Sequence, residues 1–241
     1  MCRHIAYLGS EVRLGALLVD PPFGLVRQAW APRRQRHGTI NADGFGVGWY
    51  ASGDPLPARY RHDRPLWADA SFQDLARVVR STAMLAAVRD GTPGLPYGEA
   101  TCAPFATGRW LFSHNGAIPR WTELAAALGP AELAGLAAPT DSAVLWALLG
   151  PRLVAGDPPA DAVAETVAMA APYGGRLNLL LGDGRQIVAT AWGDSLCWRA
   201  VGSGTVVASE PFDDEAGWHE VPDRHLLHAT PDGVRTIALE G

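Results

Sequence analysis

Short apolar segments with strand character lie toward both ends of the chain, and segments with helical spacing lie between them. The strand-like segments are apolar or alternating and are bounded by Gly or Asp, which commonly end strands. They are Arg3–Leu8, Phe45–Tyr50, Met84–Val88, Trp110–Ser113, Leu177–Leu181, Ile187–Trp192, Leu196–Val201 and Val206–Ala208. The helix-like segments are Phe72–Arg80, Trp121–Leu128, Ser142–Val154 and Ala160–Ala170. This order predicts layered α and β structure around one core.

The chain has 241 residues, of which 48% are hydrophobic, and it is long enough to bury a sizeable core. Its Pro-rich stretches are short and typical of loops, so we expect one domain over residues 1–241. A net charge of −5 offers no basic surface for a phosphate backbone, so nucleic acid is not expected as a partner. Without a run of 18 apolar residues, no membrane span is expected either.

The three cysteines, Cys2, Cys102 and Cys197, are far apart in the sequence. No pair has zinc-ligand spacing, and an odd number argues against a disulfide framework. These features predict a protein of the reducing cytoplasm that needs no metal.

Cys2 directly follows the initiator methionine, and a small second residue allows methionine aminopeptidase to expose it as the first residue. Cys2 would then carry both a thiol and a free α-amine. The α-amine titrates at about 7.7–8.0 in model peptides, so it can serve as general base for the thiol. The alternative is that position 2 holds a small buried residue at the edge of a strand.

An apolar segment at Leu111–Ser113 runs through His114 into Asn115 and Gly116. The Asn115 side-chain amide and the Gly116 backbone N–H can together donate two hydrogen bonds to a developing oxyanion. An Asn-Gly pair is also typical of a hairpin turn. His114 is a candidate base, or a strand-end histidine with local hydrogen bonds.

Two charged residues lie where a substrate could meet them. Arg89 closes an apolar strand before a loop rich in Gly and Pro, and its planar fork suits a carboxylate. The alternative for Arg89 is a structural ion pair or a solvated loop charge. Asp141 precedes the helix-like segment that starts at Ser142, where it can receive an ammonium group or cap the helix.

These segments, together with the glycine-rich stretch 36–50, resemble in this order the class II glutamine amidotransferase domain. The resemblance implies an N-terminal-nucleophile fold of the α+β class, a four-layer αββα sandwich, with no cofactor. It further implies that Cys2 is the nucleophile and that Asn115 and Gly116 form the oxyanion hole. Arg89 with Thr92 would hold the glutamyl α-carboxylate, and Asp141 the α-ammonium. Many members follow the arginine with Trp-Ala-Thr-His-Gly, whereas here residues 90–94 read Asp-Gly-Thr-Pro-Gly.

Further stretches are similar to one branch of that family, the amidohydrolases of ergothioneine biosynthesis. They are Met1–His4, Asp20–Pro22, Ala31–Gly38, Asn41–Gly44, Ala208–Pro211 and Val221–His225. This similarity implies a small-molecule partner, γ-glutamyl-hercynylcysteine sulfoxide, which is hydrolysed to glutamate and hercynylcysteine sulfoxide. Aromatic faces suit the trimethylammonium of that leaving group. The aromatic candidates are Trp30, Trp49, Tyr50, Trp67, Trp110 and Tyr173.

Two alternatives share these residues. One is a glutaminase subunit that supplies ammonia to a separate synthase, and the other is a non-catalytic module that binds amino acids. The glutaminase-like fold takes up the 241 residues and leaves no room for an acceptor domain, which favours hydrolysis. The residues predict no particular oligomeric state.

Overall fold

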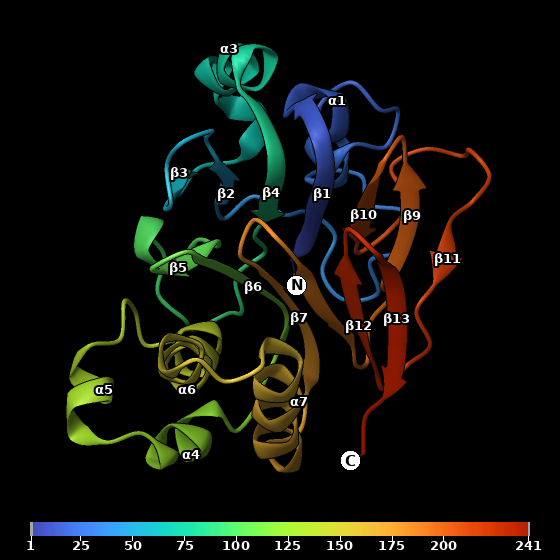
Figure 1. The fold of residues 1–241 in the computed structure, drawn as a ribbon. Coiled ribbons are helices and arrows are strands. Elements are labelled where there is room, and N and C mark those ends of the chain that lie inside the picture. Colours follow the sequence, from blue (N-terminus) through green and yellow to red (C-terminus); the bar gives the residue numbers. More distant parts are fainter. Residues whose placement is uncertain (1, 241) are drawn as a thin grey trace.

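In the computed structural model, which describes residues 2–240, two antiparallel sheets pack face to face (Figure 1). The first sheet has the strand order β11-β9-β10-β1-β4-β2-β3, and the second has the order β13-β12-β8-β7-β6-β5. The strands of the first sheet are β1 (Arg3–Arg13), β2 (Phe45–Tyr50), β3 (Pro57–His62), β4 (Arg80–Val88), β9 (Cys197–Val201), β10 (Gly204–Ala208) and β11 (His219–Glu220). Those of the second are β5 (Phe105–Thr107), β6 (Trp110–Ala117), β7 (Arg176–Gly182), β8 (Ile187–Ala191), β12 (His225–Thr230) and β13 (Gly233–Ala238).

The helices lie on the outer faces of the two sheets (Figure 1). Those beside the first sheet are α1 (Gly15–Leu18), α2 (Leu25–Gln28) and α3 (Ala70–Val78). Those beside the second are α4 (Trp121–Leu124), α5 (Pro130–Ala134), α6 (Asp141–Ala155) and α7 (Pro159–Ala170). Within residues 2–240, no helix is long and apolar enough to cross a membrane.

Three buried apolar clusters separate four layers. One lies between the sheets and includes Leu85 of β4 and Leu180 of β7. A second packs the other face of the first sheet against α1, α2 and α3, and a third packs the second sheet against α6 and α7. The order helices, sheet, sheet, helices is the four-layer αββα sandwich, so the predicted fold class is confirmed.

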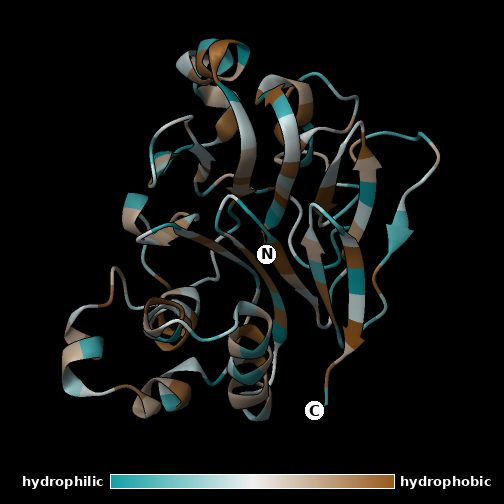
Figure 2. Ribbon diagram, in the orientation of Figure 1, coloured by the Kyte–Doolittle hydropathy of each residue, from teal (hydrophilic) through white to brown (hydrophobic). Residues whose placement is uncertain are grey.

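The central strands read as unbroken apolar runs because both of their faces are covered. In β1, Ile5 and Tyr7 join the cluster under the helices, whereas Ala6 and Leu8 join the cluster between the sheets. Successive side chains point to opposite faces of a strand, so a strand inside four layers needs apolar residues at every position. The edge strand β11 is exposed and hydrophilic (Figure 2).

Two of the predicted helices need correction. The segment Trp121–Leu128 is the short helix α4 followed by a 3-10 turn at Ala125–Ala127. The segment Phe72–Arg80 is shifted, because Asp69 caps α3 by accepting a hydrogen bond from the Phe72 backbone N–H at 3.1 Å. Residue Val79 is already extended, and Arg80 begins β4.

His4 of β1 is fully buried between the sheets, where burial and the neighbouring charge of Arg3 lower its pKa to about 3. The neutral imidazole is therefore favoured in the folded state. Its contribution to stability is present above pH 6.5, its unfolded value, and is lost as the pH falls from there toward 3. We expect the free energy of unfolding to fall by up to about 1.4 kcal/mol per pH unit in this range because of His4 alone.

Urea denaturation of wild type and His4→Asn at pH 7 and pH 5 checks this expectation. The His4→Asn variant should be less stable at pH 7 but should lose less stability between the two values. The matched control His225→Asn, at the partly exposed first residue of β12, should lose as much stability between pH 7 and pH 5 as wild type does. An equal loss of stability between pH 7 and pH 5 in all three proteins would contradict the prediction.

Candidate active site

Cys2 lies immediately before β1, which is paired with β4 and β10 in the middle of the first sheet. It is partly exposed, whereas Arg3 and His4 after it are fully buried. Cys2 therefore lies at the end of a buried strand, where the space between the sheets opens toward the surface. Cys2 also lines a small cavity of about 30 Å³.

The structure brings Asn115 of β6 into contact with Cys2, 113 residues away in the sequence. The Cys2 backbone nitrogen donates to Asn115 Oδ1 at 3.1 Å. Asn115 Nδ2 lies 3.4 Å from Ser209 Oγ, which also accepts a hydrogen bond from the His4 backbone N–H at 3.0 Å. These contacts orient the Asn115 amide, with its oxygen toward the nitrogen of Cys2. An oxyanion-hole role for Asn115 stays a prediction.

The Asn-Gly pair does not form a hairpin turn, so that interpretation is wrong. Asn115 and Gly116 lie inside β6, where they pair with Asn178 and Leu177 of β7. A Cβ at Gly116 would collide with the Arg176 carbonyl and the His114 ring. Glycine is required here by the close approach of the neighbouring strand.

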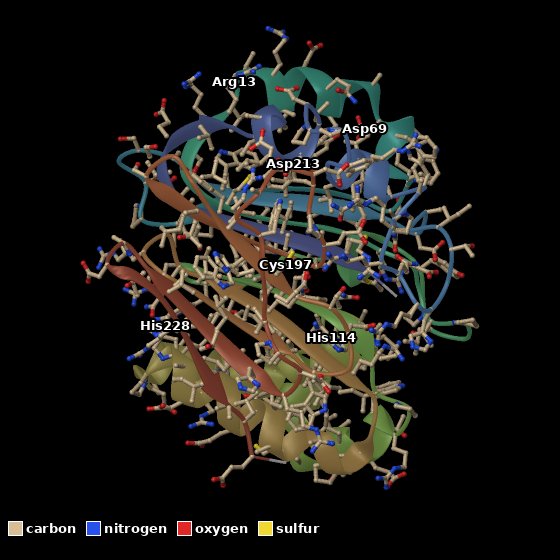
Figure 3. All side chains as sticks on the ribbon, turned by 90° about the vertical axis from the view of Figure 1, so that its right-hand side faces the viewer. Arg13, Asp69, His114, Cys197, Asp213 and His228 are labelled. Atoms are coloured by element: carbon tan, nitrogen blue, oxygen red, sulfur yellow. The ribbon has the colours of Figure 1, made fainter. Side chains whose placement is uncertain are left out.

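Both ring nitrogens of His114 are occupied. Nε2 lies 2.9 Å from the Arg176 carbonyl oxygen, which can only accept, so Nε2 carries the hydrogen. Nδ1 lies 3.0 Å from Ser142 Oγ, within hydrogen-bond distance. His114 comes from the second sheet and Cys197 from the first, as the labelled side chains in Figure 3 show. The interpretation of His114 as a locally hydrogen-bonded residue is confirmed.

Arg89 directly follows β4 and lines the same cavity as Cys2. It is only 9% exposed, so it is not a solvated loop charge. Its guanidinium donates to the carbonyl oxygens of Asp43 at 3.3 Å and Pro96 at 3.1 Å. Thr92, in contrast, is exposed and is not among the residues lining this cavity. The structure therefore brings Arg89 together with Cys2 but leaves Thr92 outside.

Asp141 is the first residue of α6, and the cap of this helix is Thr140, whose side chain accepts from the Ala143 N–H at 3.2 Å. The Asp141 carboxylate is buried and accepts from the Ile118 N–H at 3.0 Å and from the Ser142 N–H at 2.8 Å. The next residue, Ser142, lines the cavity with Cys2. Asp141 is thus held close to the cavity, and its role toward an ammonium group stays a prediction.

Ser209 and Glu210 are site residues to which the sequence reasoning gave no role. The Glu210 carboxylate is fully buried and accepts from the backbone N–H groups of Arg33 at 2.9 Å and Arg34 at 2.8 Å. It also lies 3.6 Å from Arg3 Nε. Glu210 thereby links the loop around residues 31–44 to the start of β1 through these hydrogen bonds and this ion pair. The signal in the sequence was the polar pair directly after the apolar β10.

Arg89→Lys is expected to raise KM, because lysine keeps the charge but loses the fork that suits a carboxylate. The loss of a charged hydrogen bond predicts an increase of about 10- to 100-fold, with a smaller decrease in kcat. Steady-state kinetics on a γ-glutamyl amide measure both constants, and Arg80→Lys, an exposed arginine at the other end of β4, is the control. Unchanged kinetics for Arg89→Lys would indicate that another arginine binds the α-carboxylate of the glutamyl group.

A family model described as class-II glutamine amidotransferases matches residues 16–200. The chain belongs to this family. The γ-glutamyl-hercynylcysteine sulfoxide hydrolase of Mycobacterium tuberculosis H37Rv is 43% identical over 244 residues, covering 100% of this chain and 97% of the relative. The protein of the same name from Mycolicibacterium smegmatis is 44% identical over 230 residues, covering 94% of this chain and 95% of the relative.

Among solved structures, the glutamine phosphoribosylpyrophosphate amidotransferase from B. subtilis is 15% identical, with a TM-score of 0.70. The match covers 99% of this chain and 49% of that enzyme. It supports the N-terminal-nucleophile fold of this family member.

Proposed function

We propose that the chain hydrolyses the γ-glutamyl amide of γ-glutamyl-hercynylcysteine sulfoxide to glutamate and hercynylcysteine sulfoxide, through a thioester at Cys2. The contact between Cys2 and Asn115 carries this proposal, because it places a nucleophile beside an amide donor and in the cavity lined by Arg89. The identity of the substrate is taken from the names of the two mycobacterial hydrolases, which align with this chain over nearly their full length.

The general base in this mechanism is the α-amine of Cys2. His114 has no free ring nitrogen, and the lowered pKa of His4, about 3, makes its imidazole a weak base. The backbone nitrogen of Cys2, which would become this α-amine, donates to Asn115 Oδ1 at 3.1 Å. It becomes available only when Met1 has been removed, and Met1 lies outside the residues that the structure describes.

The reaction proceeds in two halves. The α-amine takes the thiol proton, and the thiolate attacks the γ-carbonyl while Asn115 Nδ2 and the Gly116 N–H stabilise the oxyanion. The C–N bond then breaks, and the amine leaves with the proton returned by the Cys2 ammonium. Water next attacks the thioester, giving up a proton to the α-amine, and glutamate and the free thiol are released. Arg89 and Asp141 hold the two charges of the glutamyl group so that the carbon of its γ-carbonyl stays at the sulfur.

Incubation of the purified protein with γ-glutamyl-hercynylcysteine sulfoxide should yield glutamate and hercynylcysteine sulfoxide one for one, without ammonia or ATP. Free glutamine should be a poor substrate, because its small leaving group lacks the remote binding energy that orients the amide. Mass spectrometry and ammonia detection measure the products. Efficient ammonia release from glutamine with the conjugate untouched would indicate a glutaminase subunit. Tight binding of the conjugate without any turnover would indicate a binding module.

A further inference from the structure

Arg176 is the first residue of β7 and lies beside the residues that the proposed mechanism uses for the oxyanion. It pairs with Ala117, and Asn178 two residues later pairs with Asn115. Alternate residues of a strand share a face, and so do directly paired residues of neighbouring strands. Arg176 is therefore on the same face of the second sheet as Asn115, which is the face that meets Cys2.

An ion pair holds the guanidinium of Arg176 at Asp194. Its Nε lies 2.9 Å from Asp194 Oδ2, and the Asp194 side chain is only 2% exposed. Gly193 makes room for this pair, because a Cβ there would lie 2.9 Å from Arg176 Cγ. Gly193 also has a positive φ of 88°, which favours glycine.

Asp194 lies next to Asn178, whose Nδ2 donates to the Asp194 carbonyl oxygen at 3.0 Å, and Asn178 pairs with Asn115 across the strands. Arg176 and Asp194 do not line the small cavity of Cys2 itself. Burial raises the pKa of Asp194, while the charges of Arg176, Arg3 and His37 oppose that shift. Arg3 also interacts electrostatically with Cys2, which it follows in the chain. The carboxylate of Asp194 is thus within electrostatic reach of both Arg176 and Arg3, the first residue of β1.

The ion pair with Asp194 uses Nε and leaves the terminal fork of Arg176 available. Within residues 2–240, no hydrogen bond or ion pair engages Nη1 or Nη2 of Arg176. The side chain is 21% exposed, so the fork can meet a ligand without moving the buried part. Two parallel N–H donors on a fixed stem are the geometry that binds a carboxylate.

The chemistry of the leaving amine supplies such a carboxylate. In a γ-glutamyl conjugate of an α-amino acid, the carbon next to the scissile nitrogen bears a carboxylate, whereas glutamine has only hydrogens on that nitrogen. Arg89 and Asp141 are already assigned to the charges at the other end of the glutamyl group. We propose that Arg176, oriented by Asp194, binds the carboxylate of the leaving amine and so selects γ-glutamyl conjugates of α-amino acids. This inference rests on the proposed function and names the substrate class of the same site.

The test compares γ-glutamyl-hercynylcysteine sulfoxide with an analogue in which hydrogen replaces the carboxylate beside the scissile nitrogen. Wild type should prefer the carboxylate compound in kcat/KM by about 10- to 100-fold, the scale of a charged hydrogen bond. In Arg176→Gln this preference should fall to about two-fold or less, because only the rate for the carboxylate compound decreases. The matched control Arg185→Gln, at the exposed turn after β7, should keep the wild-type preference.

Arg176→Gln leaves the buried carboxylate of Asp194 without its partner, and this variant can fail to fold. The double variant Arg176→Gln with Asp194→Asn removes both charges and should show the same loss of preference, with folding verified by circular dichroism. A preference that survives in folded variants would overturn the inference while leaving the proposed function intact. Wild type that hydrolyses neither compound would overturn the proposed function, and this inference with it.

Discussion

Cys2→Ala is expected to reduce hydrolysis of a γ-glutamyl conjugate by about 10⁶-fold, the scale seen when a catalytic nucleophile is removed. Arg89, Asp141 and Asn115 remain in place in this variant, so the Kd of the substrate should change by only a few-fold. Turnover assays measure the loss, and calorimetric titration of the inactive variant measures the affinity. Mass spectrometry of rapidly quenched wild type should also detect a glutamyl adduct on Cys2, which the variant cannot form.

The other two cysteines provide matched controls. Cys102 and Cys197 are both fully buried, and burial raises the pKa of the Cys102 thiol to about 11 and raises that of Cys197 as well. Their thiols stay protonated at neutral pH and are therefore poor nucleophiles. Cys197→Ala in particular, in β9 away from the cavity, should keep wild-type turnover. If Cys102→Ala or Cys197→Ala were as inactive as Cys2→Ala with the fold intact, Cys2 would not be the nucleophile.

The strands that could be predicted from the sequence are those covered on both faces. Burial on both sides of β1, β4, β7 and β8 makes their sequences apolar throughout, and such runs stand out. The hairpin of β12 and β13 was missed, because polar residues such as His228 and Arg235 interrupt it on an exposed edge. Helices of four or five residues, such as α1 and α5, are too short to show helical periodicity.

The site was predictable only in part, because its geometry depends on strand pairing. The sequence alone cannot distinguish a turn from a strand interior at Asn115 and Gly116. The pairing with β7, some 60 residues later, makes that distinction, and no local pattern encodes it. The role of Ser209 could not be predicted for the same reason, since its contacts with His4 and Asn115 join three segments that are distant in sequence.

A residue left in front of Cys2 is expected to reduce turnover by about 10²- to 10⁴-fold, the usual contribution of a general base. The extension converts the α-amine into an amide nitrogen, which is not basic and cannot take the thiol proton. The histidines in the site do not replace it, because His114 is occupied at both ring nitrogens and burial suppresses the basicity of His4. Asn115 Oδ1 would still accept a hydrogen bond from the amide, so this loss is one of catalysis, with folding retained.

The sharpest comparison uses one protein before and after cleavage of a removable N-terminal tag that exposes Cys2 as the first residue. Intact mass verifies each form, and turnover should increase on cleavage by about 10²- to 10⁴-fold. A third form, with a single glycine before Cys2, adds the least bulk and should be slowed as much as the tagged form. In the cleaved enzyme, kcat/KM should rise with pH up to the range of a free α-amine, about 7.7–8.0 in model peptides. Full turnover with the glycine in place would show that another group takes the thiol proton. His37, which interacts with Asp194 beside the site, would then be the next base to test.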